Sequence, residues 1–429
     1  MLASLNLHGI GPAQNLDMQL GQRVNLFTGD NGLGKSFILE CAWWALSGHW
    51  PGLPAFPRDA AGQSDPEIRY EVTDATGKLY SGLSLYDWES QEWSSPSDRP
   101  NIPGLLIYAR MDGAFAIWDP TRNQQTSSKA SSFAPLAFTQ SDIWDGLRDE
   151  EAGKTTYLSN GLIADWIHWQ NGPNEEPFRT LKNVLLRLSP PGIERGDMGR
   201  LEPGAPQRLP RDSRLIPTIR HSYGQVPVVY ASAGVRRILA LAYLIVWAWE
   251  EHKTQSRLIR KAPQKRMVIL IDEIEAHLHP QWQRTILPAL LDVWKDLAQD
   301  LQIQLLIATH SPLVMASMEP FFDDSGDKIF HLDVAQSSQS GTEVVVQEQD
   351  FVKYGSVDSW LRSDVFELAQ ARSLQAEKAI EDARRLQEAE VVTKENVIEV
   401  SDRLIKYLAA NDGFWSRWLY FADRHGVDL

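Results

Sequence analysis

The sequence predicts an α/β protein in which a parallel sheet carries helices, with an inserted antiparallel β subdomain and a helical C-terminal region. Three observations lead to this prediction. An apolar run, Val24 to Phe27, precedes a glycine-rich loop and then a helix-like stretch, Phe37 to Ala45. Two further apolar runs, Met267 to Ile271 and Leu305 to Ala308, end in polar residues, as parallel strands buried on both faces do. Beyond Gly355 the composition shifts to helix formers.

We expect one large domain over residues 1–355, followed by a helical region over residues 356–429. Within the large domain, alternating apolar and polar residues over about 67–120 predict the antiparallel insert. Residues of about 140–255 predict a mostly helical region that includes the apolar run Ile238 to Trp249. That run is too short to cross a bilayer and is typical of a buried helix.

Charge and cysteine content limit the partners and the compartment. The formal net charge of the 429 residues is −14, with a pI near 5.2, so contact with DNA requires a local basic patch. The stretches Arg195 to Arg220 and Arg257 to Arg266 are the candidates, and the alternative is that they pair with acids of the protein itself. The single cysteine, Cys41, fits a reducing compartment. Because no secretory leader is recognisable, we expect a cytoplasmic protein without a membrane partner.

The loop between the first apolar run and its helix matches the pattern Gly, four residues, Gly-Lys-Ser. In such a loop, backbone N–H groups approach phosphate oxygens, and the following helix adds a favourable dipole. We expect Lys35 to neutralise the β- and γ-phosphates of ATP and Ser36 to ligate Mg²⁺. The predicted nucleotide-binding residues of this loop are Gly29, Asp30, Asn31, Gly32, Leu33, Gly34, Lys35 and Ser36. A glycine turn with an unrelated lysine is the alternative.

Polar side chains follow the two later apolar runs. Asp272 and Glu273 end the first run, and His310 follows the second. The carboxyl ends of parallel strands meet at the ligand-binding edge of a sheet. We expect Asp272 to hold Mg²⁺ through the outer coordination sphere and Glu273 to polarise the attacking water. His310 would hydrogen-bond the γ-phosphate or position water. The predicted catalytic residues are Glu273, His310 and Lys35.

The order of these motifs, with Ser232-Ala233-Gly234 between them, resembles the ABC-type ATPases of the SMC, RecF and OLD group. The resemblance implies an ABC-ATPase head that forms a head-to-tail dimer. A signature serine and glycine of one subunit then contact the γ-phosphate held by the other. By position, Ser232 and Gly234 resemble that signature; a small-residue turn before a buried helix is the alternative. Gln140 is the candidate for the family's Q-loop glutamine, which would contact nucleotide and metal. The metal-binding residues so implied are Ser36, Asp272 and Gln140.

Two stretches, Asp272 to Pro280 and Thr309 to Pro312, resemble more narrowly the stand-alone ATPases of bacterial anti-phage operons, such as the Septu, PARIS and retron-associated ATPases. His277 and His279 suggest a metal site, but the group's use of this loop at the dimer interface favours a structural or allosteric role. The resemblance covers residues 1–355 firmly and the tail loosely. It implies a sensor ATPase with ATP and Mg²⁺ as cofactors. Its partners would be a second copy or a higher oligomer, and a separately encoded nuclease or toxin effector.

Two departures from the wider group bear on function. A globular segment, and not a pair of coiled-coil arms, joins Lys35 to Ser232, and the acids of a TOPRIM nuclease are missing after His310. Two alternatives remain: a RecF- or SMC-like repair ATPase that acts directly on DNA, and an ATP-gated scaffold with little turnover. The terminal Trp415 and Trp418 either contact a partner or dock the helical tail onto the main domain.

Overall fold

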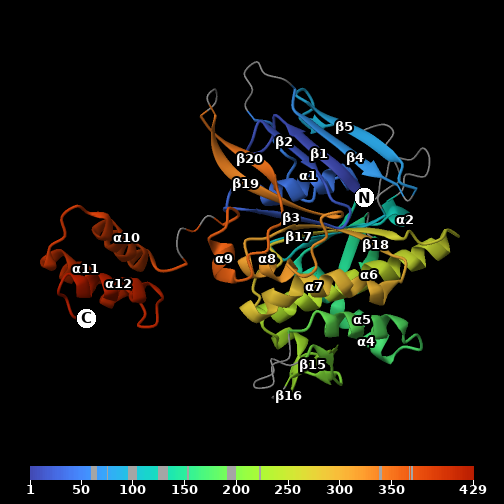
Figure 1. Ribbon diagram of the computed structural model, residues 1–429. Coiled ribbons are helices and arrows are strands. Elements are labelled where there is room, and N and C mark those ends of the chain that lie inside the picture. Colours follow the sequence, from blue (N-terminus) through green and yellow to red (C-terminus); the bar gives the residue numbers. More distant parts are fainter. Residues whose placement is uncertain are drawn as a thin grey trace. The chain divides into compact units, whose positions relative to one another are not determined.

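The computed structural model describes residues 1–58, 65–74, 76–94, 104–123, 134–151, 154–190, 200–221, 224–337, 341–366, 368 and 371–429. The chain forms two compact units, Met1–Gly355 and Ser356–Leu429. In the first unit (Figure 1), an antiparallel sheet, helix α1, the central sheet and the helices α6 and α7 follow one another as layers. None of the helices in the described ranges is long and apolar enough to span a bilayer.

The central sheet has eight strands in the order β20-β19-β3-β18-β17-β7-β8-β9. Neighbouring strands from β19 to β7 pair in parallel, and the strands beyond them at each end pair antiparallel. The strands are β3 Val24–Gly29, β7 Leu105–Ala109, β8 Phe115–Trp118, β9 Leu136–Phe138, β17 Arg266–Asp272, β18 Gln302–Ala308, β19 Asp327–Ser337 and β20 Gly341–Gln349. Because the parallel strands are covered on both faces, most of their residues are apolar, which explains the apolar runs in the sequence. The buried polar residues Asn25 of β3 and Gln304 of β18 are exceptions, and each is hydrogen-bonded.

A second sheet is antiparallel, in the order β2-β1-β4-β5-β6. Its strands are β1 Leu2–His8, β2 Asn15–Gln19, β4 Glu67–Thr73, β5 Leu79–Asp87 and β6 Glu92–Trp93. The opening hairpin therefore joins the strands of the predicted insert in one sheet. The strands β7 and β8 also fall within residues 67–120, but they belong to the central sheet. All residues of β7 and β8 are buried, as strands covered on both faces require.

Helices cover both faces of the central sheet. The helices of the first unit are α1 Lys35–Ser47, α2 Pro120–Asn123, α3 Gln140–Asp145, α4 Leu162–Asn171, α5 Glu176–Arg187, α6 Ala233–Leu258, α7 Pro280–Leu297 and α8 Pro312–Met318. Residues 140–255, expected to be mostly helical, also contain small antiparallel sheets. These pair β10 Leu147–Glu151 with β11 Lys154–Ser159, β13 Gln207–Arg208 with β14 Leu215–Ile216, and β15 Thr218–His221 with both β12 Glu202–Pro203 and β16 Gly224–Pro227. The one-turn 3-10 helix Val228–Tyr230 leads into α6.

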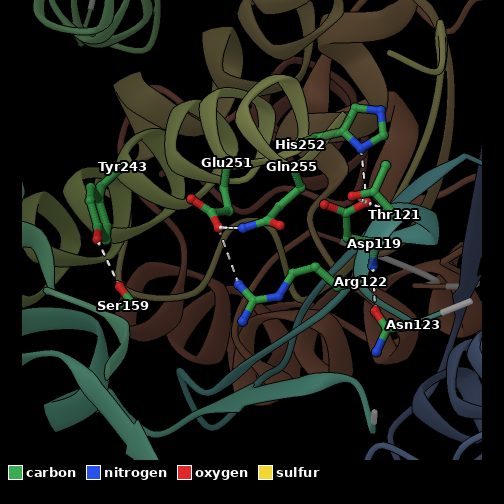
Figure 2. Close-up of polar contacts among 9 residues, drawn as sticks. All are labelled: Asp119, Thr121, Arg122, Asn123, Ser159, Tyr243, Glu251, His252 and Gln255. Atoms are coloured by element: carbon green, nitrogen blue, oxygen red, sulfur yellow. Dashed lines mark hydrogen bonds and ion pairs between the residues drawn. The ribbon is translucent and has the colours of Figure 1, made fainter. Parts of the chain in front are cut away.

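Polar contacts fix the C-terminal half of α6 (Figure 2). His252 is fully buried, and its Nδ1 lies 2.8 Å from Oδ1 of Asp119, just before α2. The backbone N–H of Gln264 donates to Nε2 of the same ring at 2.8 Å, so the ring hydrogen is on Nδ1 and is donated to Asp119. Nη1 of Arg122, in α2, lies 3.5 Å from the carboxylate of Glu251, the residue before His252. The helix is therefore tied to the end of β8 and to the chain that enters β17.

The second unit is helical, with α9 Val357–Leu361, α10 Leu374–Glu388, α11 Lys394–Tyr407 and α12 Phe414–Arg424. Its core contains Trp418, which is fully buried and donates from Nε1 to the Ser401 hydroxyl at 3.0 Å. The indole of Trp415 is half-exposed and donates to the carbonyl of Ala409 at 2.8 Å. Trp418 is thus a core residue of this unit, and a direct partner contact would require it to leave that core.

Candidate functional site

Three strands of the central sheet end at the same level. In the register, Phe27 of β3 pairs with Ala308 of β18, and Ala308 pairs with Asp272 of β17. The residues that follow these strands therefore lie side by side at the carboxyl edge, where parallel sheets bind ligands. The predicted phosphate loop, the pair of acids and His310 are brought together by this register.

The phosphate loop depends on glycine at two positions. Gly29 has φ 126 and Gly34 has φ 100, which L-residues with a side chain rarely adopt. A Cβ on Gly29 would lie 2.2 Å from the carbonyl oxygen of Leu332, and one on Gly34 would lie 2.6 Å from Pro12. After Gly34 the chain enters α1 directly, so the backbone N–H groups of the helix N-terminus face the loop.

Lys35 is buried and folded back over the loop that precedes it. Its Nζ donates to the carbonyl of Gly29 at 2.8 Å and to that of Asp30 at 2.7 Å. Burial lowers the pKa of Lys35 to about 8, against the charges of Asp272, Asp30, Glu273 and Glu275, which raise it. The ammonium group is therefore only partly stabilised, and anionic oxygens would stabilise it further.

Ser36 and Asp272 lie close together at the N-terminus of α1. The Ser36 hydroxyl hydrogen-bonds the carboxylate of Asp272. Burial raises the pKa of Asp272, although this hydrogen bond and the charges of Arg237 and Lys35 lower it. Among the described residues no group of three or more His, Cys, Asp or Glu side chains could hold a metal ion alone. A hydroxyl and a carboxylate in contact instead fit Mg²⁺, which takes its other ligands from phosphate and water.

His310 lies beside the phosphate loop. Burial lowers its pKa, the charge of Lys35 lowers it further, and a hydrogen bond from the ring to the carbonyl of Gly29 opposes both. A lowered pKa leaves the imidazole neutral at pH 7, so one ring nitrogen can donate and the other accept. This is the form that could bond a phosphate oxygen or a water.

Glu275 is a site residue that sequence reasoning placed only in the loop after the acids. Its carboxylate accepts from the Thr309 hydroxyl at 2.8 Å and from the backbone N–H of His310 at 2.5 Å. Burial raises its pKa, and these hydrogen bonds lower it. Glu275 therefore ties the loop after β17 to the end of β18. A third acid close behind the strand-end pair was the only signal in the sequence.

The predicted signature turn lies at the N-terminus of α6. Ser232 is exposed, and its hydroxyl accepts from the backbone N–H of Val235 at 3.4 Å as the helix N-cap. Gly234 is buried against the loop after β17, because a Cβ there would lie 2.5 Å from the carbonyl oxygen of His277. His279 caps α7 through Nδ1, which accepts from Gln281 at 3.3 Å. That contact gives His279 a structural role.

Gln140 is exposed at the start of α3, beside the signature turn. Its Nε2 donates to the carbonyl of Asp112 at 3.5 Å, and within the described ranges it has no hydrogen bond to the phosphate loop. It lines a cavity of about 110 Å³ whose other residues include Trp144, Arg237 and His277. The predicted contact of Gln140 with nucleotide and metal therefore stays a prediction.

The basic stretches considered for DNA are partly paired within the protein. Arg214 lies 2.6 Å from Asp145 and 3.0 Å from Asp212, and Lys265 pairs with Asp300. Arg195 lies outside the described residues. These ion pairs favour the alternative in which the arginines bond acids of the same chain.

The fold and the strand-end residues define a P-loop nucleotide-binding domain. The family described as "AAA domain, putative AbiEii toxin, Type IV TA system" matches residues 24–316, and the chain belongs to this family. Its members contain an AAA domain, which confirms the predicted class, an AAA-type ATPase.

Short stretches of the chain are similar to retron ATPases, which confirms the predicted relation to that group. The "Retron Ec83 probable ATPase" of Escherichia coli is 32% identical over 103 residues, which are 24% of this chain and 15% of that protein. The "Retron Vc95 probable ATPase" of Vibrio cholerae serotype O1 biovar El Tor is 43% identical over 51 residues, 12% and 9% of the two chains. The chain thus matches only a small part of these relatives.

Solved structures with similar folds include the SMC head domain from Thermotoga maritima, at 14% identity and a TM-score of 0.39, covering 82% of this chain and 99% of that one. The recombination mediator protein RecF is another, at 13% identity and a TM-score of 0.39, with coverage of 82% and 98%.

Proposed function

We propose that this protein binds ATP with Mg²⁺ and hydrolyses it to ADP and phosphate at a site that a second copy completes. One observation carries the proposal: Lys35, the Ser36–Asp272 pair and His310 converge at one sheet edge, while Ser232 is exposed at the end of α6. The first group is what a bound Mg-triphosphate requires, and the exposed serine is accessible to a second molecule.

Each residue has a role that its surroundings support. Lys35 would exchange the carbonyls of Gly29 and Asp30 for the β- and γ-phosphate oxygens. Ser36 and Asp272 would hold Mg²⁺, which when bound neutralises charge on the phosphates. Glu273, half-exposed at the end of β17, would orient and polarise the attacking water. A neutral His310 would donate a hydrogen bond to the γ-phosphate or to that water.

The second copy would contribute Ser232, Gly234 and the N-terminus of α6. A helix of 26 residues carries a partial positive charge at its N-terminus, which favours the negative γ-phosphate of the other subunit. ATP would then join two heads because each nucleotide contacts both, and hydrolysis would separate them. Gln140, beside the signature turn, would move toward the metal and the nucleotide as the heads close.

We further propose that the chain is the regulatory ATPase of a cytoplasmic anti-phage complex with a separately encoded effector, a nuclease or a toxin. The similarity to two proteins named as retron ATPases supports this role. Co-purification from the native operon, with mass measurement in the presence and absence of ATP, would identify the effector. Recovery of the chain without any other subunit in both conditions would contradict the proposal.

Glu273→Gln tests the reaction. The amide keeps the shape of the side chain but does not polarise water, so steady-state turnover should fall about 100-fold or more while ATP still binds. The same variant should accumulate as an ATP-dependent dimer, measured by light scattering after gel filtration. Turnover unchanged in Glu273→Gln would remove that residue from the mechanism, and absence of turnover in the intact assembly would favour an ATP-gated scaffold.

A mixing experiment tests the contribution of the second copy. Lys35→Ala and Ser232→Arg should each be inactive alone, because each dimer then lacks one half of both sites. In a mixture, half of the random dimers combine the two variants, and one of their two sites is intact, so about a quarter of wild-type turnover should return. A mixture that stays inactive, although the subunits exchange, would contradict a site shared between two copies.

A further inference from the structure

We propose that Arg237, on the second turn of α6, is a positioning residue that fixes the orientation of Glu273 and links it to the signature turn of its own subunit. This inference deepens the proposed function and rests on it for the role of Glu273. The family motifs assign no role to Arg237, and the contacts of its guanidinium carry the argument.

One nitrogen of Arg237 binds the backbone on both sides of Glu273. Nη2 donates to the carbonyl of Asp272 at 2.8 Å and to the carbonyl of Glu273 at 3.1 Å, while Nη1 donates to the carbonyl of Met111 at 3.3 Å. The two strand-end carbonyls belong to the peptide units that flank the Cα of Glu273. Rotation about either backbone bond of Glu273 would break one of these hydrogen bonds. The guanidinium therefore fixes the direction in which the Glu273 side chain leaves the backbone.

The backbone held in this way is unusual. Glu273 has φ 49 and His277 has φ 63, a left-handed conformation that residues other than glycine rarely adopt. Such conformations persist only where the surroundings hold them. The turn between them has two backbone hydrogen bonds, Ala276 to Glu273 at 3.0 Å and Leu278 to Glu275 at 2.9 Å. From outside the turn, Arg237 binds the backbone at Glu273, and Thr309 and His310 bind the side chain of Glu275.

The same helix end carries the signature residues. Ser232 caps this helix end, and Gly234 packs against the carbonyl of His277. With the hydrogen bonds of Arg237, the first two turns of α6 therefore contact both the end of β17 and the loop after it. At its other end α6 is tied down through His252 and Asp119 (Figure 2). Because residues of one helical turn move together, a shift of Ser232 on contact with a partner's nucleotide would be passed to Arg237 and from there to Glu273.

The charges around Arg237 match this role. Burial lowers its pKa, and the carboxylates of Glu273, Asp272, Glu275 and Asp112 raise it, but a guanidinium stays protonated throughout the physiological range. Its guanidinium can donate hydrogen bonds to all three carbonyls at once. A lysine side chain is shorter and ends in a compact ammonium group that cannot reproduce this arrangement of donors. Lysine should therefore keep the charge and recover only part of the positioning.

Two substitutions and a matched control test the inference in the full chain. Arg237→Gln removes the charge and the paired Nη donors of the guanidinium, and Arg237→Lys keeps the charge. Arg266→Gln is the control, because Arg266 begins β17, also donates to a backbone carbonyl, that of Thr73, and lies about 20 Å away along the strand. The readouts are kcat, the Kd for ATP, and hydrogen–deuterium exchange of residues 273–278 without nucleotide.

For Arg237→Gln we expect kcat to fall about 10- to 100-fold while the Kd for ATP changes less than about threefold, since positioning acts on the reaction and not on ground-state binding. Amide exchange over residues 273–278 should become about tenfold faster, with residues 29–36 unchanged. Arg237→Lys should give intermediate values of kcat and exchange, and Arg266→Gln should match the wild type in all three.

Exchange over residues 273–278 that stays at the wild-type rate in both Arg237 variants would overturn the inference, whatever the turnover. A fall in ATP affinity as large as the fall in kcat would also overturn it. If Arg237→Gln does not fold, judged by circular dichroism, Arg237→Lys decides the question through the same exchange measurement. Absence of turnover in the wild type would refute the proposed hydrolysis, but faster exchange would still establish the backbone contact.

Discussion

The pKa of Lys35 leads to a quantitative prediction for ATP binding. With a pKa of about 8 in the nucleotide-free protein, Lys35 is mostly protonated at pH 7 and mostly neutral at pH 9. A bound triphosphate favours the charged form, so binding above pH 8 requires Lys35 to take up a proton. The affinity for ATP should therefore fall as the pH rises through 8.

The size of the effect follows from the protonated fraction. A group of pKa 8 is about 90% protonated at pH 7 and about 10% protonated at pH 9, so the apparent Kd should rise about tenfold between them. His310 does not contribute in this range, because its pKa is lowered from 6.5 and the ring is already neutral. The lowered pKa of Lys35 also affects the stability of the nucleotide-free protein. The contribution of Lys35 to the free energy of unfolding increases as the pH rises from about 8 to the ordinary pKa of lysine, because in this range the unfolded chain binds more protons than the folded one.

Isothermal titration with a non-hydrolysable ATP analogue and Mg²⁺ measures both quantities, since buffers of different ionisation enthalpy report the protons taken up. Lys35→Arg is the control, because a guanidinium stays protonated and removes the lysine titration while the carboxyls of Asp30, Asp272, Glu273 and Glu275 remain. A Kd that does not change between pH 7 and 9 would refute the reasoning. The same slope in Lys35→Arg would assign it to the carboxyls.

Three further substitutions test the scaffold. His252→Ala leaves the buried carboxylate of Asp119 without its ring partner and should lower the free energy of unfolding by about 3–5 kcal/mol, measured in urea; a loss under 1 kcal/mol would contradict this. Gly34→Ala at φ 100 should abolish ATP binding in a protein that still folds, measured by titration, and unchanged affinity would contradict the strain argument. Trp418→Ala should destabilise the second unit by about 3–5 kcal/mol, and the melting of isolated residues 356–429 is the measurement.

Local sequence patterns were sufficient for the strands and the loop of the nucleotide site. The apolar runs before Gly29, after Lys265 and before Thr309 became β3, β17 and β18, because a parallel strand covered on both faces is mostly apolar. The strand β7 has the same property, since Leu105–Ala109 is buried throughout. In the sequence, however, β7 follows β4, β5 and β6 of the antiparallel sheet. The pattern of apolar and polar residues alone did not show that β7 belongs to the central sheet.

The roles of Arg237 and Glu275 could not be predicted in this way, because all the partners of Arg237 named above and one of the two partners of Glu275 are backbone groups. Arg237 contacts carbonyls 35 and 36 positions further along the chain, and Glu275 binds the N–H of a residue 35 positions further on. A carbonyl or an N–H is present at every position, so no residue type on the partner strand marks the contact. What selects the pair is the register that sets Asp272 level with Ala308, together with the depth at which α6 crosses the end of β17. Motifs therefore identify the groups that meet the nucleotide, while the groups that hold those residues in place emerge only from the packing of α6 against the sheet edge.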